Sequence, residues 1–321
     1  MRTAGWAIRV LAAAVLWTGA GAAGALDMPC RTARLIVPWA PGGETAINFE
    51  LIADAVNRSG VSPRLQVVTI PGQGGNKGAK VARDARPDGC TLFALHQSAI
   101  TSYLSGRVDF TWDAFEPVAL LTGTPSMIGA RPGASYADLA GLIAAARAAP
   151  QTVLAGSTLG STSHFLFLLL EKAAGIKLKH VSYDGTRERL TALLAQTIDV
   201  GEINVVSAKE YLDDDALKAL GIATAARDPL APEVPTLAEQ GVDITFGTDR
   251  GVVLPKGAAG EVVAFWERAF LDALAGPELR RALEAKGNTI IGQGAEAYRA
   301  ALAAEFAALE AAAAEAGLYR R

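Results

Sequence analysis

Two patterns of hydrophobic and polar positions alternate along the chain. Short apolar runs rich in Val, Ile and Leu lie at residues 34–39 (RLIVPW), 65–70 (LQVVTI) and 91–95, and each predicts a β-strand. The segments between them, 47–56 and a shorter one ending near residue 85, have the three-to-four-residue spacing of a helix. Strands that alternate with helices are typical of an α/β fold in which helices flank mainly parallel sheets.

The same alternation starts again at residue 127. Further strands are predicted at 153–155, 180–183, 198–202 and 251–254, and further helices at 136–148, 163–174, 187–195, 261–274 and 277–286. The restart predicts two lobes. We expect lobe 1 to contain residues 26–127 and 248–321, and lobe 2 to contain residues 128–247. The hinge is expected where the chain crosses between them, near 122–126 and 247–251.

The last predicted helix, residues 295–316, is rich in alanine. Its larger side chains form one stripe, made of Tyr298, Leu302, Phe306 and Leu309. A stripe at this spacing indicates an amphipathic helix that packs on the surface of a lobe.

The first 25 residues have the features of a signal peptide. Arg2 and Arg9 form a basic start, an apolar run follows at residues 10–22, and Ala23-Gly24-Ala25 supplies small residues for cleavage. A membrane anchor is the alternative, but the run is shorter than the roughly 20 residues that a spanning helix needs. We therefore expect residues 1–25 to be removed and the mature chain to be secreted.

Composition and cysteine content narrow the function classes. The 321 residues include 33 acidic and 30 basic side chains, so the charge gives no reason to expect a nucleic-acid partner. Both cysteines, Cys30 and Cys90, follow the signal peptide, and an oxidising compartment favours one disulfide between them. Lipid attachment at Cys30 and two buried thiols are the alternatives. No metal site is predicted, because the cysteines lack a nearby histidine pair.

Four turns rich in Gly, Ser or Thr follow predicted strands and precede predicted helices. They lie at residues 41–45 (PGGET), 71–76 (PGQGGN), 96–98 (HQS) and 156–163 (GSTLGSTS). Such a turn directs backbone N–H groups and the positive end of the helix dipole toward one point, which suits an anion. If the strand ends face each other, the four loops converge across a cleft.

Two enzyme classes fit the sequence less well. The glycines Gly72, Gly74 and Gly78 resemble a loose dinucleotide fingerprint, but they follow the second strand, and the next strand ends at His96 instead of an acid. A serine hydrolase would use one of His96, His164 and His180, but the sequence contains no G-x-S-x-G motif. We therefore expect a protein that is not an enzyme and holds no cofactor.

Eight motifs, in order, resemble the periplasmic solute-binding proteins of tripartite tricarboxylate transporters, the Bug family. They are RLIVPWAPGG (34–43), PGQGGNKGA (71–79), PDGCTLF (87–93), FEPVALL (115–121), GSTSH (160–164), HVSYDGT (180–186), IDVGEIN (198–204) and PEVPTLAEQG (232–241). The resemblance covers essentially the whole mature chain. It implies a two-lobed periplasmic clamp that closes on an organic anion and delivers it to a membrane permease; we expect it to act as a monomer.

The resemblance also implies which residues hold the carboxylate of the ligand, through backbone amides, hydroxyls and ordered waters. From lobe 1 these are Gly42, Gly43, Glu44, Thr45, Gly74, Gly75, Asn76 and Ser98. From lobe 2 they are Ser157, Thr162, Ser163, Tyr183, Gly185, Thr186 and Asn204.

The sequence departs from the family at two acidic positions. Ala46 and Ile203 stand where many members have Asp, while Glu44, Glu202 and Asp249 lie near these positions or near the return crossing. We therefore expect that one of these three acids contacts an amine on the ligand; the alternative is that these acids face solvent. Asp249 is counted among the candidate site residues. Arg250 is a candidate to clamp a distal carboxylate with both arms of its guanidinium. A sensory module and a secreted enzyme remain the alternative functions.

Overall fold

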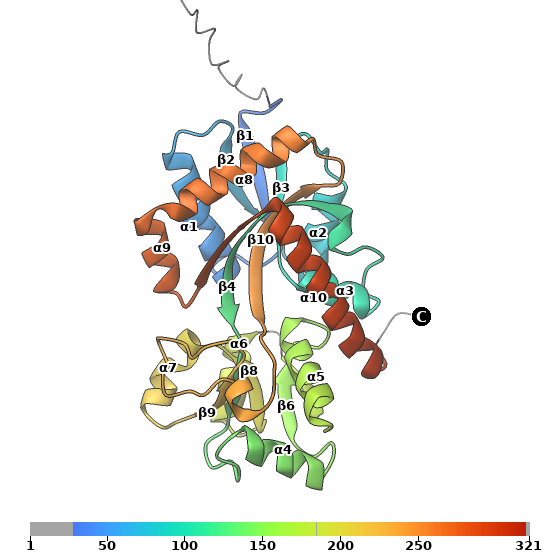
Figure 1. Ribbon diagram of the computed structural model, residues 1–321, viewed down its shortest axis with the longest axis vertical. Coiled ribbons are helices and arrows are strands. Elements are labelled where there is room, and N and C mark those ends of the chain that lie inside the picture. The colour runs from blue at the N-terminus through green and yellow to red at the C-terminus, as the bar shows by residue number, and fades with distance from the viewer. Residues whose placement is uncertain (1–27, 184, 319–321) are drawn as a thin grey trace, which may run out of the picture.

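Two β-sheets, each covered by helices, are stacked end to end in the computed structural model (Figure 1), which describes residues 28–183 and 185–318. The predicted signal peptide lies outside the described residues. Lobe 1 is the six-stranded sheet with its helices, in strand order β11-β4-β10-β3-β1-β2. Lobe 2 is the five-stranded sheet with its helices, in order β7-β6-β8-β5-β9.

The strands of lobe 1 are β1 (Thr32–Val37), β2 (Arg64–Thr69), β3 (Thr91–Leu95), β4 (Phe115–Pro125), β10 (Gly247–Pro255) and β11 (Thr289–Gly294). Its helices are α1 (Glu44–Arg58), α2 (Asn76–Arg83), α3 (Ser98–Leu104), α8 (Gly260–Ala275), α9 (Pro277–Glu284) and α10 (Ala295–Glu315). Helices α1, α8 and α9 cover one face, where Phe49 and Trp266 are fully buried. Helices α2, α3 and α10 cover the other face, so the sheet is buried on both sides.

The strands of lobe 2 are β5 (Met127–Ala130), β6 (Leu154–Ser157), β7 (Lys179–Ser182), β8 (Val200–Ile203) and β9 (Lys218–Ile222). Its helices are α4 (Leu139–Ala148), α5 (Thr162–Ala174), α6 (Thr186–Leu194) and α7 (Val205–Asp213). Short 3₁₀ turns lie at Gln73–Gly75, Trp112–Ala114 and Ala238–Gln240. Phe165 and Phe167 of α5 are fully buried, whereas α6 and α7 share a separate apolar cluster around Leu193.

The predicted arrangement of two helix-flanked sheets is confirmed, but both sheets are mixed instead of mainly parallel. In lobe 1, β1 pairs in parallel with β2 and β3, whereas β10 runs antiparallel to β3 and β4, and β11 antiparallel to β4. In lobe 2, β5 is antiparallel to both its neighbours. For β10 the reason is the crossing between lobes, since this strand returns from lobe 2 and enters the first sheet in the opposite direction.

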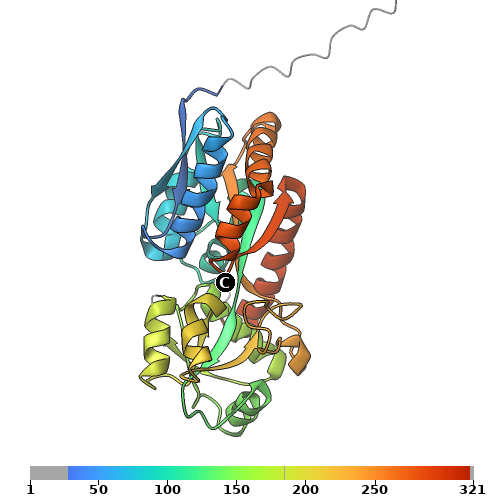
Figure 2. The same cartoon turned by 90° about the vertical axis from the view of Figure 1, so that its left-hand side faces the viewer.

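The hinge segments expected from the sequence lie side by side. Strand β4 ends at Pro125, β5 begins at Met127, and the return strand β10 pairs with β4 from Gly247 opposite Pro125 to Arg250 opposite Thr122. Figure 2 shows β4 running straight from the upper lobe into the lower one. The two crossings therefore form one hydrogen-bonded ribbon.

Helix α10 links the lobes at a second place, because its apolar stripe packs on β4 and α3 while its C-terminal half contacts α5 of lobe 2 (Figure 1). Tyr298, Leu302 and Leu309 are buried, as predicted from the stripe. The core cluster on this side is continuous from lobe 1 into lobe 2.

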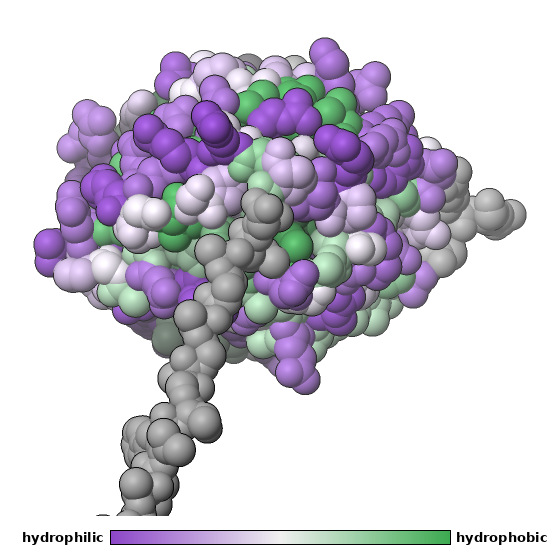
Figure 3. All heavy atoms as spheres, turned by 90° about the horizontal axis from the view of Figure 1, so that it is seen from above, coloured by the Kyte–Doolittle hydropathy of each residue, from purple (hydrophilic) through white to green (hydrophobic). Residues whose placement is uncertain are grey.

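Cys30 and Cys90 form a disulfide with a Cα–Cα distance of 6.0 Å, joining the segments that precede β1 and β3. This confirms the pairing and excludes lipid attachment at Cys30 in this form of the protein. The end of lobe 1 seen in Figure 3 is largely hydrophilic, with small apolar areas between charged side chains. Among the described residues, no helix is both long and apolar enough to cross a membrane.

Candidate functional site

A polar cleft of about 520 Å³ lies between the lobes and is lined by residues of both. Ten of the residues expected to hold the ligand line it: Gly42, Gly43, Glu44, Thr45, Gly74, Thr162, Ser163, Gly185, Thr186 and Asn204. They come from loops of both lobes, so the convergence expected from the turn pattern is present. A molecule in this cleft can touch both lobes at once.

The N-termini of four helices border the cleft. Helix α1 begins at Glu44 in lobe 1, and α5, α6 and α7 begin at Thr162, Thr186 and Val205 in lobe 2. Asn204 caps α7, because its side-chain oxygen accepts a hydrogen bond from the Ser207 amide at 2.9 Å. Each N-terminus carries partial positive charge, and four around one cleft favour an anion.

The loop before α5 is held rigid by its own side chains. Ser163 Oγ accepts a hydrogen bond from the Thr158 amide at 2.9 Å, and His164 Nδ1 accepts one from the Gly160 amide at 3.0 Å. Burial, followed by the neighbouring His180, lowers the pKa of His164 to about 4, so its ring is neutral and accepts. The hydroxyl of Thr162 is buried and has no partner among the described residues.

A buried arginine closes the lobe 1 side of the cleft. Arg250 Nη2 lies 3.0 Å from Glu44 Oε1, and Arg250 also donates to Thr45 Oγ1, Thr124 Oγ1 and the Thr248 carbonyl. Thr124 Oγ1 in turn donates to Glu44 Oε1 at 2.6 Å. Protein acceptors thus occupy most of the guanidinium, so the geometry does not favour Arg250 as a clamp for a distal carboxylate.

A second buried pair forms part of the lobe 2 wall. Arg189 pairs with Glu202 and also donates to the Glu202 carbonyl at 2.6 Å, while Ser126 Oγ donates to Glu202 Oε1 at 2.9 Å. Glu44 and Glu202 therefore both face arginines inside the protein. Neither acid is left as a free negative charge for an amine, which weakens the expectation of an amine-bearing ligand.

Five expected residues lie beside the cleft without lining it. Gly75, Asn76 and Ser98 lie at the starts of α2 and α3, Ser157 is the last residue of β6, and Tyr183 follows β7. Two of them contact residues that do line the cleft. The Tyr183 carbonyl accepts a hydrogen bond from Thr158 Oγ1 at 2.5 Å, and a Cβ at Gly75 would lie 3.2 Å from Trp39.

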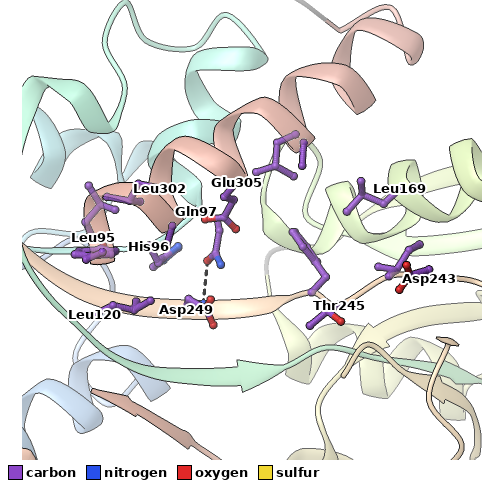
Figure 4. A pocket seen from close by; sticks show the side chains of 16 residues that line it. Leu95, His96, Gln97, Leu120, Leu169, Asp243, Thr245, Asp249, Leu302 and Glu305 are labelled. Carbon is purple, nitrogen blue, oxygen red and sulfur yellow. Dashed lines mark hydrogen bonds between the residues drawn. The ribbon is translucent and has the colours of Figure 1, made fainter. Parts of the chain in front are cut away.

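Asp249 lies on the opposite side of β10 from Arg250 and lines a second pocket of about 360 Å³ (Figure 4). Its amide donates to Gln97 Oε1 at 3.0 Å, and the Gln97 side chain also bonds Glu305 of α10. Burial raises the pKa of Asp249 to about 6, and burial together with Asp249 raises the pKa of Glu305 to about 8. Asp249 therefore lies on the far side of the β4–β10 ribbon, outside the cleft.

Eight residues that line the cleft lie outside the four predicted turns and were missed: Trp39, Arg107, Thr124, Arg187, Glu188, Arg189, Ser207 and Thr248. His96, Thr158 and Ser161 also line it; they lie in two of those turns but were not named among the residues that hold the ligand. His96 stacks on Trp39 with ring centroids 4.9 Å apart and accepts a hydrogen bond from the Ser98 amide. Burial, with a smaller effect from Arg250, lowers the pKa of His96 to about 3. The neutral ring acts as a wall of the cleft instead of a charged contact.

The comparisons with known proteins agree with this geometry. The chain matches the family model described as "Tripartite tricarboxylate transporter family receptor" over residues 56–312. It is 30% identical over 289 residues to a protein of Pseudomonas sp. strain P51, described as a UPF0065 protein in the tcbD-tcbE intergenic region. The alignment covers 87% of this chain and 85% of that protein.

Two solved structures share the architecture. A TctC solute binding protein from Polaromonas, solved with no ligand, aligns with a TM-score of 0.76 and 27% identity over 89% of this chain and 99% of that one. MatC from Rhodopseudomonas palustris, solved with bound malate, aligns with the same TM-score, identity and coverage. The family model describes a receptor and the Polaromonas neighbour is a solute binding protein, in agreement with the expectation that the chain is not an enzyme.

Proposed function

Since the chain belongs to the tripartite tricarboxylate transporter receptor family, we propose that it captures a small organic anion in the cleft between its lobes and delivers it to a membrane permease. The observation that carries this proposal is the convergence of four helix N-termini from two lobes on one polar cleft. The malate bound by MatC makes a small carboxylate the first class to test.

The charges of the cleft support an anion over a cation. Four arginines and three acids line it: Glu44 and Glu202 are each paired with a buried arginine, and the exposed Glu188 stands against two exposed arginines, Arg107 and Arg187. The neutral donors among the expected residues, such as the hydroxyls of Thr45, Thr162 and Ser163, can add hydrogen bonds to a carboxylate.

Capture proceeds by closure of the two lobes around the β4–β10 ribbon. A ligand that touches both lobes makes more contacts in the closed form, and this difference in affinity shifts the population toward closure. A ligand with equal affinity for both forms would shift nothing. The ribbon carries both chain crossings, so bending it moves one lobe against the other.

The proposal is tested by thermal unfolding of the mature protein with a panel of mono-, di- and tricarboxylates, with amines of matched size as controls. A carboxylate present at about 100 times its dissociation constant stabilises the folded form by about 2.7 kcal/mol and raises the melting temperature. Isothermal titration then gives the stoichiometry, expected to be one ligand per chain. A stabilising response to the amines alone would refute the anion assignment.

Delivery needs a separate test in cells. Deleting the gene should abolish high-affinity uptake of the identified anion, and expression of the chain with its signal peptide should restore it. Export itself is tested by fractionation, since the proposed function places the mature chain in the periplasm. Restoration by a variant that lacks residues 1–25 would contradict that placement.

A further inference from the structure

Arg107 stands at the mouth of the cleft, where lobe 1 touches lobe 2. It follows α3 in a turn held by the bond from its amide to the Ser102 carbonyl at 2.9 Å. Its side chain extends out of lobe 1, and Nη2 donates a hydrogen bond to the Gly160 carbonyl in the loop before α5 of lobe 2. Ser105 Oγ lies 3.5 Å from the same carbonyl. The contact therefore joins the two lobes across the cleft opening.

Two glycines, one from each lobe, leave room for this guanidinium. Gly74 has φ +64° and Gly160 has φ +71°, in the left-handed region that favours glycine. A Cβ at Gly74 would lie 3.1 Å from Arg107 Nη1, and a Cβ at Gly160 would lie 2.9 Å from Nη2. Both loops therefore approach the guanidinium closely, and both also line the candidate cleft or border it.

Arg107 differs in its partners from the two buried arginines that line the cleft. Arg189 and Arg250 are buried and face Glu202 and Glu44. Among residues 28–183 and 185–318, the bond shown for the Arg107 guanidinium goes to a neutral carbonyl. Desolvation lowers the pKa of Arg107, which nevertheless stays charged. Its positive charge is thus available to an anion that enters the cleft.

We propose that Arg107 is both the latch that holds the lobes together and the residue whose charge selects anionic ligands; this rests on the proposed function. In the closed form, one arm of the guanidinium holds Gly160 while the remaining N–H groups face the cleft and bind the anion. In the open form, the bond to Gly160 is broken and water solvates the charge. Ligand binding and the latch therefore favour the same closed arrangement.

The latch is tested with Arg107→Gln and Arg107→Lys, with Arg147→Gln as the matched control. Arg147 is also exposed and also donates to a backbone carbonyl, that of Ala174 at 2.8 Å, but both groups lie within lobe 2 and outside the cleft. Isothermal titration with the carboxylate identified for the wild type should show affinity about tenfold weaker or more for Arg107→Gln, as expected for a charge-assisted bond. Arg107→Lys should retain part of the wild-type affinity, and Arg147→Gln should bind as tightly as the wild type.

The salt dependence of the affinity shows whether Arg107→Gln weakens binding by removing a charge or by disturbing the packing around residue 107. Raising ionic strength should weaken binding by the wild type more than by Arg107→Gln, because only the wild type presents this exposed charge. Equal affinities, or equal salt dependence of wild type and Arg107→Gln, would overturn the anion-selecting role.

The latch itself is measured without any ligand, by small-angle X-ray scattering of the free proteins. The radius of gyration should be larger for Arg107→Gln than for wild type and for Arg147→Gln, and equal values would overturn the latch. If the wild type binds no carboxylate, the proposed function and the anion-selecting role both fail. The scattering result then still decides whether Arg107 joins the lobes.

Discussion

Replacing Arg189 with methionine should destabilise the protein by about 3–5 kcal/mol, because it leaves a buried carboxylate without its cation. The side chain of Arg189 is 4% exposed and that of Glu202 is 11% exposed, so solvent cannot replace the lost partner. The same change also removes the donors to the Glu202 carbonyl and to Thr186 Oγ1. Urea unfolding followed by circular dichroism measures the loss.

The double variant Arg189→Met with Glu202→Met tests the reasoning. It removes both charges, so it should be less destabilised than the sum of the two single variants by about 3 kcal/mol, the size of a strong coupling between contacting residues. Arg227→Met is the control, because the Arg227–Glu239 pair in lobe 2 has side chains that are 44% and 46% exposed. That change should cost less than about 1 kcal/mol. Additive losses, or a loss for Arg189→Met as small as the control, would refute the claim that burial makes this pair important.

Three further changes test other parts of the fold. Reducing the disulfide, which spans 60 residues, should lower the free energy of unfolding by about 4 kcal/mol, and unchanged urea midpoints with and without reductant would contradict this. Because the pKa of Glu305 is raised from 4.5 to about 8, folding favours its protonated form, and the free energy of unfolding should fall as pH rises from about 4.5 to 8. Thermal melts at a series of pH values measure this dependence, which should be weaker in Glu305→Gln. Gly251→Ala should cost about 1–3 kcal/mol, since its Cβ would lie 2.4 Å from the buried ring of Tyr298; a melting temperature equal to that of the wild type would show that β10 and α10 can move apart.

The hydrophobic pattern predicted those helices and strands whose residues alone determine the secondary structure. Strand β3 has the predicted bounds, and α10 buries three of the four residues of its predicted stripe. The helix starts at the glycine and serine turns were likewise visible, because capping and turn chemistry depend on adjacent residues.

Strand β4 was not predicted, although residues 115–121 were noted as a motif. Its eleven residues continue through Thr122, Gly123 and Thr124, which interrupt the apolar run. What makes this segment a strand is pairing with β10, more than 120 residues later. Its neighbour on the other side, β11, is still more distant in sequence, so no local pattern could predict this pairing.

The sequence predicted the loops that form the candidate site, but it did not predict which charged side chains line the site. Asp249 was expected in the cleft, but successive residues of a strand point to opposite faces, and Arg250 takes the cleft side. A choice between the two needs the register of β10, which depends on tertiary pairing. Arg107 contacts Gly160 from 53 positions away, so its role follows only from the contact between the lobes.

The order of strands in the lobe 1 sheet has a consequence for how the protein is made. Strand β10 lies at the centre of that sheet, between β3 and β4, although it is separated from β4 in sequence by the whole of the lobe 2 sheet. The first half of lobe 1 therefore cannot close its sheet while the chain is emerging from a ribosome or a translocation pore. The segment 127–222 contains every strand of the second sheet and can assemble first. Until residue 255 has emerged, the apolar sides of β3 and β4 lack their shared neighbour, and this interval is when the newly made chain most needs protection from aggregation.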